Sequence, residues 1–480
     1  MNTIVEAIAH YAEKTPSKTA VNVGKESLTY EELWRSIVSA TYNLSSINQG
    51  KVVIFSAEKS ATFICHYFAA HLEGISCVLV DPKITEETIA TIAESLPVDC
   101  MFSSKEIPAP FPVKRYILSE TTTKQKQCFP APNEVADYMF TTGTTGIRKC
   151  VPLTHANLFA AAKNINTFIG NTASDHELIA LPLCHSFGLG RLRCSLLAGA
   201  TCTIISNFAN ERKLLKLIGS GEITGFSMVP AAWHYIRHLC ASRFIEAARH
   251  NLRFIEIGSA ALPMHDKLFL MENLPNTRIC MHYGLTEASR SAFIDFHNDI
   301  HKLSTCGKAT PGVDIAIFSK EGHKVQLGEP GEICIKGQHV TTGYLHTNTE
   351  QCFFGSYFRT GDLGFIDLDG YLHLLGRIKE LINVGGKKVS PDEVEHIINQ
   401  IPGIAESACI AAKDPEGILG EVVKAYIVPE NSTKLETSCI IQHLREHLEP
   451  HKVPRILEFR FKPIPRTDSG KLQRQKLSEE

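Results

Sequence analysis

The chain has 480 residues, more than one hydrophobic core usually accommodates, so at least two domains are predicted. Its composition is ordinary for a globular protein, with 44% hydrophobic and 21% charged residues, and its formal net charge of −2 argues against a nucleic-acid-binding surface. The start of the chain has no secretory signal pattern, and no uninterrupted run of about 18 apolar residues occurs. We therefore expect a cytoplasmic protein with no integral membrane segment. The 15 cysteines are scattered and never spaced as Cys-x-x-Cys, which predicts reduced, mostly buried thiols.

Short apolar runs that predict strands alternate with helical patterns through the first three quarters of the chain. Predicted helices cover residues 154–168 and 231–241. This alternation is typical of right-handed βαβ units on a mostly parallel sheet, so we expect an α/β fold. The predicted strands are KVVIFSA (51–57), ISCVLV (75–80), ADYMFTT (136–142), ELIALPL (177–183), ATCTIIS (200–206), ITGFSMV (223–229), LRFIEIG (252–258) and TRICMHYG (277–284).

From about residue 326 the pattern changes to short strands punctuated by glycine, as in GEPGEICIKG (328–337) and DLDGYLHLLG (367–376). We expect a β-rich subdomain that completes a large domain. Ser390, Pro391 and Glu393 then occupy the N-cap, N1 and N3 positions of a new helix. A large N-terminal domain over 1–378 and a small α+β domain over 379–480 are therefore predicted.

A segment rich in threonine and glycine, TTGTTGIRK, follows the strand at 136–142. Its glycines let the backbone approach an anion, its threonines supply hydroxyl donors, and its lysine adds positive charge. The spacing matches neither the Walker A loop nor the dinucleotide fingerprint, and a flexible surface loop is the alternative interpretation. The predicted phosphate-binding residues are Thr141, Thr142, Gly143, Thr144, Thr145, Gly146 and Lys149.

Two further motifs carry carboxylates suited to a nucleotide. HYGLTEAS (282–289) places Thr286 and Glu287 directly after a predicted strand, where they are suited to hold a phosphate and its Mg²⁺. FRTGDLG (358–364) presents Asp362 from a tight turn, and a carboxylate there is a natural acceptor for ribose hydroxyls. Taken alone, a carboxylate in either motif more often has a structural role, such as in a turn, than a role in nucleotide binding.

Cations of two later motifs complete the set. GRIKE (376–380) supplies Arg377 and Lys379 at the predicted domain junction, and PRTDSGKLQR (465–474) places Lys471 after a glycine turn. Each cation alone is more often a solvated charge. The five motifs gain weight because they occur together and in this order.

With these motifs, and from LTYEEL (28–33) to the last lysine motif, the chain resembles the AMP-forming adenylating superfamily. That superfamily contains acyl-CoA and aryl-CoA synthetases, peptide-synthetase adenylation domains and luciferases. The resemblance implies a large N-terminal domain, a small mobile C-terminal domain and a reaction in two steps. An acid and ATP give an acyl adenylate and pyrophosphate, and a thiol then displaces AMP. The implied cofactors are ATP, Mg²⁺ and CoA, or the phosphopantetheine of a carrier protein.

The resemblance also implies roles for individual residues of this sequence. In the first step Thr286 would contact phosphate, Glu287 would hold Mg²⁺, and Lys471 would bridge the acid and the ribose oxygen. Lys379 matches the hinge position of the family. The implied adenine and ribose contacts are Tyr283, Gly258, Ser259, Ala260, Asp362 and Arg377, and the implied thiol tunnel of VGGKK (384–388) contains Gly385, Gly386 and Lys387.

The acyl pocket is predicted from LPLCHSFGLG and its neighbours. His185 matches a family residue at the pocket mouth, although a core histidine is the alternative, and the pocket residues are Phe187, Phe226 and His282. The segment has no aspartate to pair with a substrate ammonium, which favours an acid without an amino group. The imidazole of His282 would shorten the cavity.

Two departures bear on this pocket and on the phosphate loop. Arg148 stands where the family usually has proline, which makes the loop more cationic. Arg191 and Arg193 lie in an otherwise apolar segment, and one hypothesis is that one of them pairs with a second anionic or polar group of the acid. The alternative is that one is solvated and the other paired with a protein carboxylate. If the segment is helical, an i,i+2 pair cannot share one face.

We expect an ATP-dependent ligase that activates a fatty or related amine-free acid and transfers it to CoA. CHSFGL is most similar to fatty acyl-CoA and acyl-carrier-protein synthetases, so loading of an acyl carrier protein is an alternative. An aryl, hydroxy or dicarboxylic acid–CoA ligase is another. A nucleotide-binding regulator without catalysis is a third, and the joint presence of Glu287, Asp362, Arg377 and Lys471 argues against it.

Overall fold

The computed structural model describes residues 1–47, 50–118, 128–142, 148–208, 210–430, 435–466 and 472–478. The chain forms two compact units, of which the first comprises residues 1–314 and 335–358 and the second residues 315–334 and 359–480. The expected α/β class is confirmed. Residues 359–378 group with the second unit, and the predicted domain boundary at 378 stays a prediction.

A nine-stranded sheet in the first unit has the order β15-β14-β13-β12-β11-β9-β10-β1-β2. Its six central strands, from β13 to β1, pair in parallel, as the βαβ pattern predicts, and the strands beyond them are antiparallel. Parallel order places the ends of β12 and β13 at one edge, where ligands bind in such sheets. The strands are β1 (Thr19–Val23), β2 (Glu26–Thr29), β9 (His176–Ile179), β10 (Thr201–Ile204), β11 (Gly225–Met228), β12 (Phe254–Ile257), β13 (Arg278–Leu285), β14 (Ala288–Asp295) and β15 (Lys308–Ala309).

A second sheet of the same unit has the order β6-β5-β3-β4-β7-β8. Its pairs are parallel except for the antiparallel pair β7–β8, and the predicted phosphate loop lies between these two strands in the sequence. Residues 143–147 of this loop lie outside the described residues. The strands are β3 (Val52–Ser56), β4 (Ser76–Val80), β5 (Val98–Phe102), β6 (Val113–Lys114), β7 (Val135–Thr142) and β8 (Arg148–Thr154).

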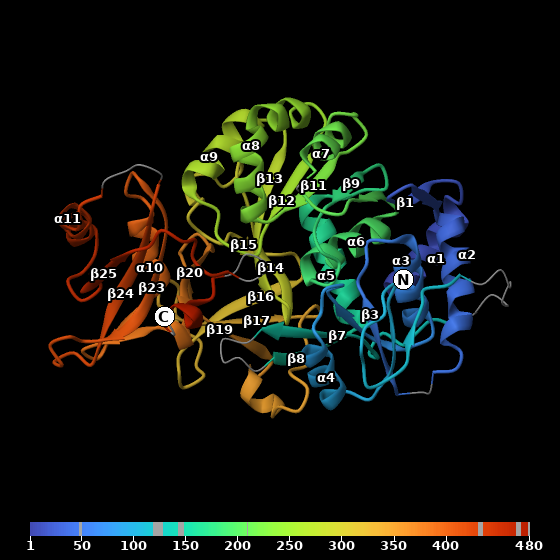
Figure 1. Cartoon of the computed structure of the whole chain (residues 1–480), viewed down its shortest axis with the longest axis horizontal. Coiled ribbons are helices and arrows are strands. Elements are labelled where there is room, and N and C mark those ends of the chain that lie inside the picture. Colours follow the sequence, from blue (N-terminus) through green and yellow to red (C-terminus); the bar gives the residue numbers. More distant parts are fainter. Residues whose placement is uncertain are drawn as a thin grey trace. The chain divides into compact units, whose positions relative to one another are not determined.

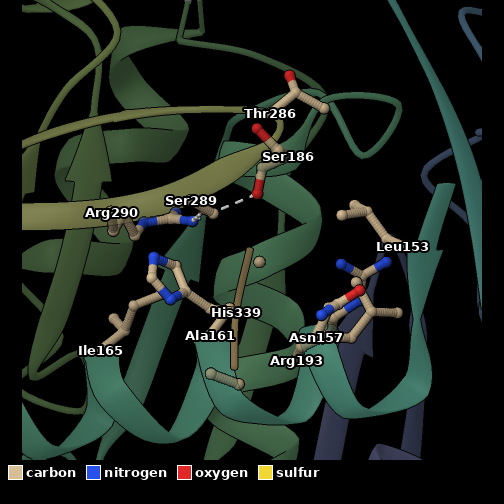
Figure 2. Close-up of a pocket in the computed structure, with 13 residues that line it drawn as sticks. Leu153, Asn157, Ala161, Ile165, Ser186, Arg193, Thr286, Ser289, Arg290 and His339 are labelled. Atoms are coloured by element: carbon tan, nitrogen blue, oxygen red, sulfur yellow. Dashed lines mark hydrogen bonds between the residues drawn. The ribbon is translucent and has the colours of Figure 1, made fainter. Parts of the chain in front are cut away.

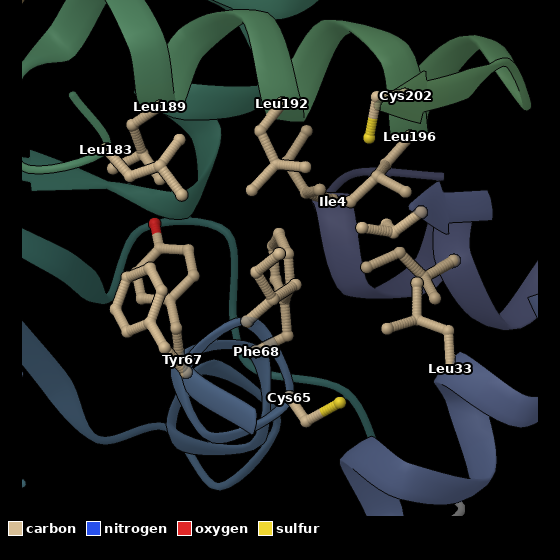
Figure 3. Close-up of a cluster of buried hydrophobic side chains, with 14 of the residues drawn as sticks. Ile4, Leu33, Cys65, Tyr67, Phe68, Leu183, Leu189, Leu192, Leu196 and Cys202 are labelled. Carbon is tan, nitrogen blue, oxygen red and sulfur yellow. The ribbon is translucent and has the colours of Figure 1, made fainter. Parts of the chain in front are cut away.

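Helices of the first unit lie between the two sheets and on their outer faces. Leu189, Leu192 and Leu196, spaced i, i+3 and i+7 on α6, point into the core between the sheets and face Tyr67 and Phe68 of α3 (Figure 3). Helices α7, α8 and α9 cover the far side of β9, β11, β12 and β13 (Figure 1). The helices are α1 (Ile4–Lys14), α2 (Tyr30–Ala40), α3 (Ala61–Leu72), α4 (Glu86–Ser95), α5 (His155–Ile169), α6 (Ser186–Ala198), α7 (Glu211–Ile218), α8 (Pro230–Ala248) and α9 (Met264–Asn273).

The helix predicted over 154–168 is confirmed as α5, where Thr154 is the N-cap in a complete capping box. The helix predicted over 231–241 continues as α8 to Ala248, with a kink at Cys240, whose φ of −151° is not helical. Among the described helices, none is both long and apolar enough to cross a lipid bilayer. The cysteines are free thiols, and most of them are buried.

Residues 313–377 form a five-stranded sheet, in the order β16-β17-β19-β18 with β20 paired to β19, and this confirms the predicted β-rich segment. In the antiparallel β19–β20 pair, Asp362 lies opposite Arg377. The strands are β16 (Val313–Phe318), β17 (Gly331–Gly337), β18 (Phe353–Phe354), β19 (Tyr357–Ile366) and β20 (Leu372–Arg377).

From η4 onward, the second unit is a small α+β fold around its own core. Helix α10 begins at Pro391 with Ser390 as N-cap, as predicted, but the Ser390 side chain makes no capping hydrogen bond. A β-carbon on Gly376 would lie 2.5 Å from the buried hydroxyl of Ser390, so glycine is needed there. The elements are η4 (Ile378–Glu380), β21 (Ile382–Val384), β22 (Lys387–Val389), α10 (Pro391–Ile398), β23 (Ile404–Lys413), β24 (Glu421–Pro429), α11 (Thr437–His447), β25 (Ile456–Phe459) and α12 (Arg474–Ser478).

Candidate active site

Thr286 and Glu287 form the turn that joins β13 to β14. Glu287 is 6% exposed, and its Oε1 accepts a hydrogen bond of 2.7 Å from the hydroxyl of Tyr344. Its backbone carbonyl accepts a second hydrogen bond, of 2.8 Å, from the amide of Thr341. The segment around Tyr344 thus fixes both the backbone and the carboxylate of Glu287.

Lys149 contacts the same tyrosine from β8. Its Nζ lies 4.1 Å from the centroid of the Tyr344 ring, a distance at which the ring attracts a cation. The predicted phosphate lysine and the predicted metal carboxylate therefore share one side chain. Gly143, Thr144, Thr145 and Gly146 lie outside the described residues, as does the side chain of Thr142, while the Thr141 hydroxyl donates to the Lys149 carbonyl at 3.5 Å.

Sequence reasoning did not select Tyr344. It lies in VTTGYLH (340–346) after Gly343, whose φ of +130° favours glycine. The amide of Leu345 donates to the carbonyl of Cys150 at 2.9 Å, which attaches this segment to β8. An aromatic residue directly after a glycine turn is the signal that could have identified it.

The turn after β12 and the tyrosine of β13 lie at one edge of the nine-stranded sheet. Ile257 pairs with Met281, so the turn that starts at Gly258 lies beside Tyr283. Ser259 has a φ of +77°, a strained conformation for a residue other than glycine. Such strain is concentrated at ligand sites, which agrees with the role that the resemblance gives this turn.

His282 lies across Gly258 and against Phe187. A β-carbon on Gly258 would lie 2.0 Å from the imidazole, so the ring occupies space that glycine leaves open. The rings of His282 and Phe187 meet edge to face, with centroids 4.7 Å apart. Burial lowers the pKa of His282 from its ordinary value, and the imidazole is therefore neutral at pH 7.

A buried ionic network lies behind His282. Oε1 of Glu256 is 2.7 Å from Nδ1 of His282 and 2.7 Å from Nε of Arg290, and Oε2 is 3.1 Å from Arg191. Burial acts to raise the pKa of Glu256, but Arg290, Arg191 and His282 together lower it well below its ordinary value. Arg191 also binds both oxygens of Glu177, at 2.6 and 2.8 Å. The Glu256 carboxylate is therefore held ionised.

Arg193 points to the opposite side of α6, as an i,i+2 spacing requires. It forms an ion pair with Asp137 and donates a hydrogen bond to the hydroxyl of Tyr67. Both arginines thus bind protein groups, and the hypothesis that one pairs with the substrate is not supported. The alternative is wrong in one respect, since Arg191 and Arg193 are both buried and neither is solvated.

A cavity of about 20 Å³ lies between α5, α6 and the start of β14, with room for one water molecule. Thr286 and Ser186 lie at one end, and α5 forms the opposite wall (Figure 2). Arg290 and His339 also line it. The Nδ1 atom of His339 and the Nε atom of Arg193 are buried without a hydrogen-bond partner among the described residues.

The other predicted acyl-pocket residues lie in different surroundings. Phe226 does not reach Phe187, because its ring packs between Phe208 and Phe244 in the core under α7 and α8. Successive strand residues face opposite sides, so the next residue, Ser227, points toward the ionic network instead. His185 is exposed at the N-cap position of α6.

In the second unit, the two predicted ribose contacts meet. Nε of Arg377 lies 2.8 Å from Oδ1 of Asp362, and Arg377 also donates to the carbonyl of Thr360 at 3.1 Å. The Asp362 side chain is 4% exposed and that of Arg377 is 42% exposed, so the pair presents its cationic side.

The remaining predicted residues of the second unit lie on turns or outside the described residues. Lys379 is in η4, directly before β21. Gly385 and Gly386, with φ of 56° and 87°, make the β21–β22 turn, and Lys387 follows them exposed. Lys471 lies outside the described residues.

Two family models match the sequence. One, described as AMP-binding enzyme, matches residues 8–345, and the other, described as AMP-binding enzyme C-terminal domain, matches residues 393–471. An oxalate–CoA ligase of Arabidopsis thaliana is 29% identical over 508 aligned positions, which cover 98% of this chain and 97% of that relative.

A 2-succinylbenzoate–CoA ligase of Staphylococcus aureus is 32% identical over 331 residues, 68% of this chain. The matched part spans only 63% of that relative. Among solved structures, ATP-bound MatB from Rhodopseudomonas palustris has a TM-score of 0.90 at 25% identity and covers 100% of this chain and 99% of its own.

Proposed function

We propose that this chain, which belongs to the AMP-binding enzyme family, activates a short carboxylic acid without an amino group and transfers the acyl group to CoA. A relative named as a CoA ligase matches along nearly its whole length, and the chain is an AMP-forming acid–CoA ligase that uses ATP. The kind of acid is inferred from the surroundings of His282.

Adenylation brings two anions together, since the oxygen of the acid attacks the α-phosphorus of ATP and pyrophosphate leaves. Positive charge that acts most strongly in the transition state lowers this barrier. Lys149, on the face of Tyr344, and Lys471 would supply that charge. Glu287 would hold Mg²⁺, since its buried carboxylate offers the oxygen ligands that this ion prefers, and bound Mg²⁺ neutralises phosphate charge.

The observation that carries the substrate proposal is the position of His282. Its imidazole fills the space over Gly258 and packs against Phe187, so it closes the place where a long acyl chain would extend. The carboxylates behind it, Glu177 and Glu256, are already bound to Arg191. They are therefore not available to pair with a substrate ammonium, and an amine-free acid is favoured.

A dicarboxylic acid is a second candidate within the same class. The guanidinium of Arg290 lines the small cavity beside Thr286, but it is bound to Glu256 and to the carbonyls of Ser186 and Phe187, so it does not carry this candidate. The observation that favours a dicarboxylic acid is the name of the Arabidopsis relative, an oxalate–CoA ligase.

The test is acid-dependent exchange of radioactive pyrophosphate into ATP, with a panel of short monoacids, hydroxy acids, dicarboxylic acids and long-chain fatty acids. We expect short acids to support the fastest exchange, and Lys471→Ala to reduce it by orders of magnitude. The fastest exchange with long-chain fatty acids would overturn the substrate proposal. Absence of AMP release with every acid would overturn the activity.

CoA as the thiol acceptor is tested with the acid selected in this way. We expect thioester formation with CoA and no formation on an acyl carrier protein that bears phosphopantetheine. The reverse result would favour carrier-protein loading. A carrier-protein partner and a cytoplasmic location stay predictions.

A further inference from the structure

One arginine of the second unit binds three carboxylates. Nη1 of Arg474 lies 3.2 Å from Glu380, and its Nη2 binds both oxygens of Glu395 at 2.9 Å and also pairs with Asp392. Its Nε donates to the carbonyl of Cys409 at 3.2 Å. Every nitrogen of the guanidinium therefore has a partner.

The cluster is mostly shielded from water. The side chains of Arg474 and Glu395 are 15% and 12% exposed, and that of Glu380 is 23% exposed. Burial raises the pKa of Glu395 to about 8, so at pH 7 Arg474 meets it as a neutral carboxyl group, while Glu380 and Asp392 supply the opposite charge. Ion pairs at partly buried sites are screened less than surface pairs, and loss of one partner leaves uncompensated charge. The cluster is therefore a firm attachment within this unit.

The three carboxyl groups come from η4 and α10, two segments that are distant from Arg474 in the sequence. Glu380 is the last residue of η4 and directly follows Lys379, the predicted hinge residue. Asp392 and Glu395 lie on the first turns of α10, and Arg474 begins α12. The guanidinium thus joins the start of the C-terminal helix to the hinge and to α10.

The segment that precedes α12 is also anchored at its other end. Arg466 and Leu472 form an antiparallel bridge, and Arg466 pairs with Glu406 at 2.9 Å. Lys471 is adjacent to Leu472 in the sequence and three residues before Arg474. Arg466 and Leu472, the residues on either side of 467–471, are therefore fixed to the second unit.

We propose that Arg474 is a positioning residue for the adenylation step, which acts by fixing the chain next to Lys471 to the residue that follows the hinge. When the predicted hinge turns, Leu472 and α12, which follow Lys471 in the sequence, then turn with it. This inference rests on the proposed function and on the predicted hinge. It assigns Arg474 no contact with substrate.

An arginine is required because of its planar, forked shape. The guanidinium has five N–H donors in fixed directions, so it can bind Glu380 on one side and Glu395 on the other at the same time. A lysine has one nitrogen and cannot span both. Arg474→Lys should therefore keep the positive charge but not bind Glu380 and Glu395 at the same time.

The test separates the two half-reactions in the full-length protein, with the acid that supports the fastest exchange in the wild type. We expect Arg474→Ala and Arg474→Lys to lower ATP–pyrophosphate exchange by about tenfold to about a hundredfold, as for a catalytic group misplaced by about 1 Å. Thioester formation from preformed acyl adenylate and CoA should change by less than about twofold. Equal loss in both half-reactions would mean a merely structural role and would overturn the proposal.

A second pair of variants keeps the test valid if Arg474 variants fail to fold. Glu380→Ala removes the link to the hinge but leaves Arg474 bound to Asp392 and Glu395. We expect it to lower exchange selectively, and Glu380→Gln, which retains an acceptor oxygen, to recover part of the loss. Unchanged exchange in Glu380→Ala would overturn the proposal.

Two controls separate this inference from the proposed function. Lys424→Gln removes an ion pair of 2.8 Å with Glu458 elsewhere in the same unit, and we expect both half-reactions to be unaffected. If the wild type shows no acid-dependent exchange, the proposed function fails. If Lys471→Ala loses exchange while the Arg474 and Glu380 variants keep it, only the present inference fails.

Discussion

The hydroxyl of Tyr344 donates a hydrogen bond of 2.7 Å to Oε1 of Glu287, while the face of the same ring carries Lys149. A phenol is suited to this position because it offers a donor at its edge and negative electrostatic potential on its face. It keeps a cation and a carboxylate near each other without letting them neutralise each other directly. Both charges can therefore serve the roles toward ATP and Mg²⁺ that we propose for them.

Tyr344→Phe should weaken metal binding more than it weakens folding. The variant keeps the ring under Lys149 and removes one hydrogen bond to a charged group, which contributes about 1.5 to 3 kcal/mol. We expect the Mg²⁺ concentration for half-maximal exchange to rise by about tenfold, since 1.4 kcal/mol corresponds to this factor. A magnesium titration of pyrophosphate exchange measures it.

The matched control is Tyr357→Phe, which removes the hydrogen bond of another tyrosine hydroxyl to a carboxylate, that of Asp314. Its magnesium titration should coincide with that of the wild type. The assignment of Glu287 as the metal ligand would be contradicted if Tyr344→Phe gave the same titration as this control.

His282→Ala should widen the range of acids toward longer chains. The substitution empties the space over Gly258 that the imidazole fills, and each added methylene in an apolar pocket changes discrimination by about 1 to 3 kcal/mol. We expect kcat/KM for acids longer by two or three carbons to rise relative to the wild-type substrate by at least about tenfold. The ratio is measured by competition between two acids.

Gly258→Ala should act in the opposite direction. Its β-carbon would lie 2.0 Å from the imidazole of His282, so the ring must move toward the substrate and activity with every acid should fall. His301→Ala, at an exposed position, is the control and should leave the preference unchanged. A His282→Ala variant with wild-type chain-length preference would show that the imidazole does not set the depth of the pocket.

Asp137→Asn should destabilise the first unit. The carboxylate is buried and pairs with Arg193, with His71 at 3.0 Å and with Tyr67 at 3.0 Å. Without its charge Arg193 remains buried and unpaired, which costs about 3 to 5 kcal/mol. Urea unfolding followed by circular dichroism measures the change, and Asp81→Asn, at an exposed position, is the control with an expected change near zero. A loss below about 1 kcal/mol would contradict the account of this ion pair.

The cluster around Arg474 should make the second unit sensitive to alkaline pH. Burial raises the pKa of Glu395 to about 8, even though Arg474 acts to lower it. The folded unit therefore holds a proton that the unfolded chain releases near pH 4.5. This stabilisation is fully present below pH 4.5 and is lost as pH rises through about 8.

Hydrogen exchange of the Cys409 amide reports this loss locally, because that amide donates to Oε1 of Glu395 at 2.6 Å. After correction for intrinsic rates, its protection should decrease between about pH 5 and about pH 9. In Glu395→Gln the corrected protection should not depend on pH in this range. A pH-dependent protection in Glu395→Gln equal to that of the wild type would place the titrating group elsewhere.

Local patterns predicted the elements of this fold well. The apolar runs that became β3, β4, β7 and β9 to β13 were recognisable because parallel strands buried on both faces are continuous apolar runs. The N-cap with proline at Ser390 located one helix start for chemical reasons that act within four residues. These local signals do not show which distant residue packs against the helix start. The sequence therefore did not predict that the Ser390 hydroxyl lies against Gly376 and makes no capping hydrogen bond.

The position of Thr286 and Glu287 at one turn was predictable, because both lie in one motif directly after a strand. The candidate site was not predictable where partners come from distant segments. Tyr344 lies 57 positions from Glu287, and nothing in either segment indicates the other. Phe226 was predicted to line a pocket with Phe187, but its ring packs with Phe208 and Phe244. The face of a strand that a residue occupies depends on which layer packs there, and the sequence does not show this.

Helix α6 carries oppositely directed arginines, one bound to β9 and β12 of the first sheet and the other to β7 of the second. Ion pairs therefore attach α6 to both sheets, and the helix has little freedom to tilt or rotate. For laboratory evolution of new acid specificities, mutations along this helix would mostly yield misfolded clones. Diversity is better placed at His282, whose imidazole fills the space over Gly258 and packs against Phe187.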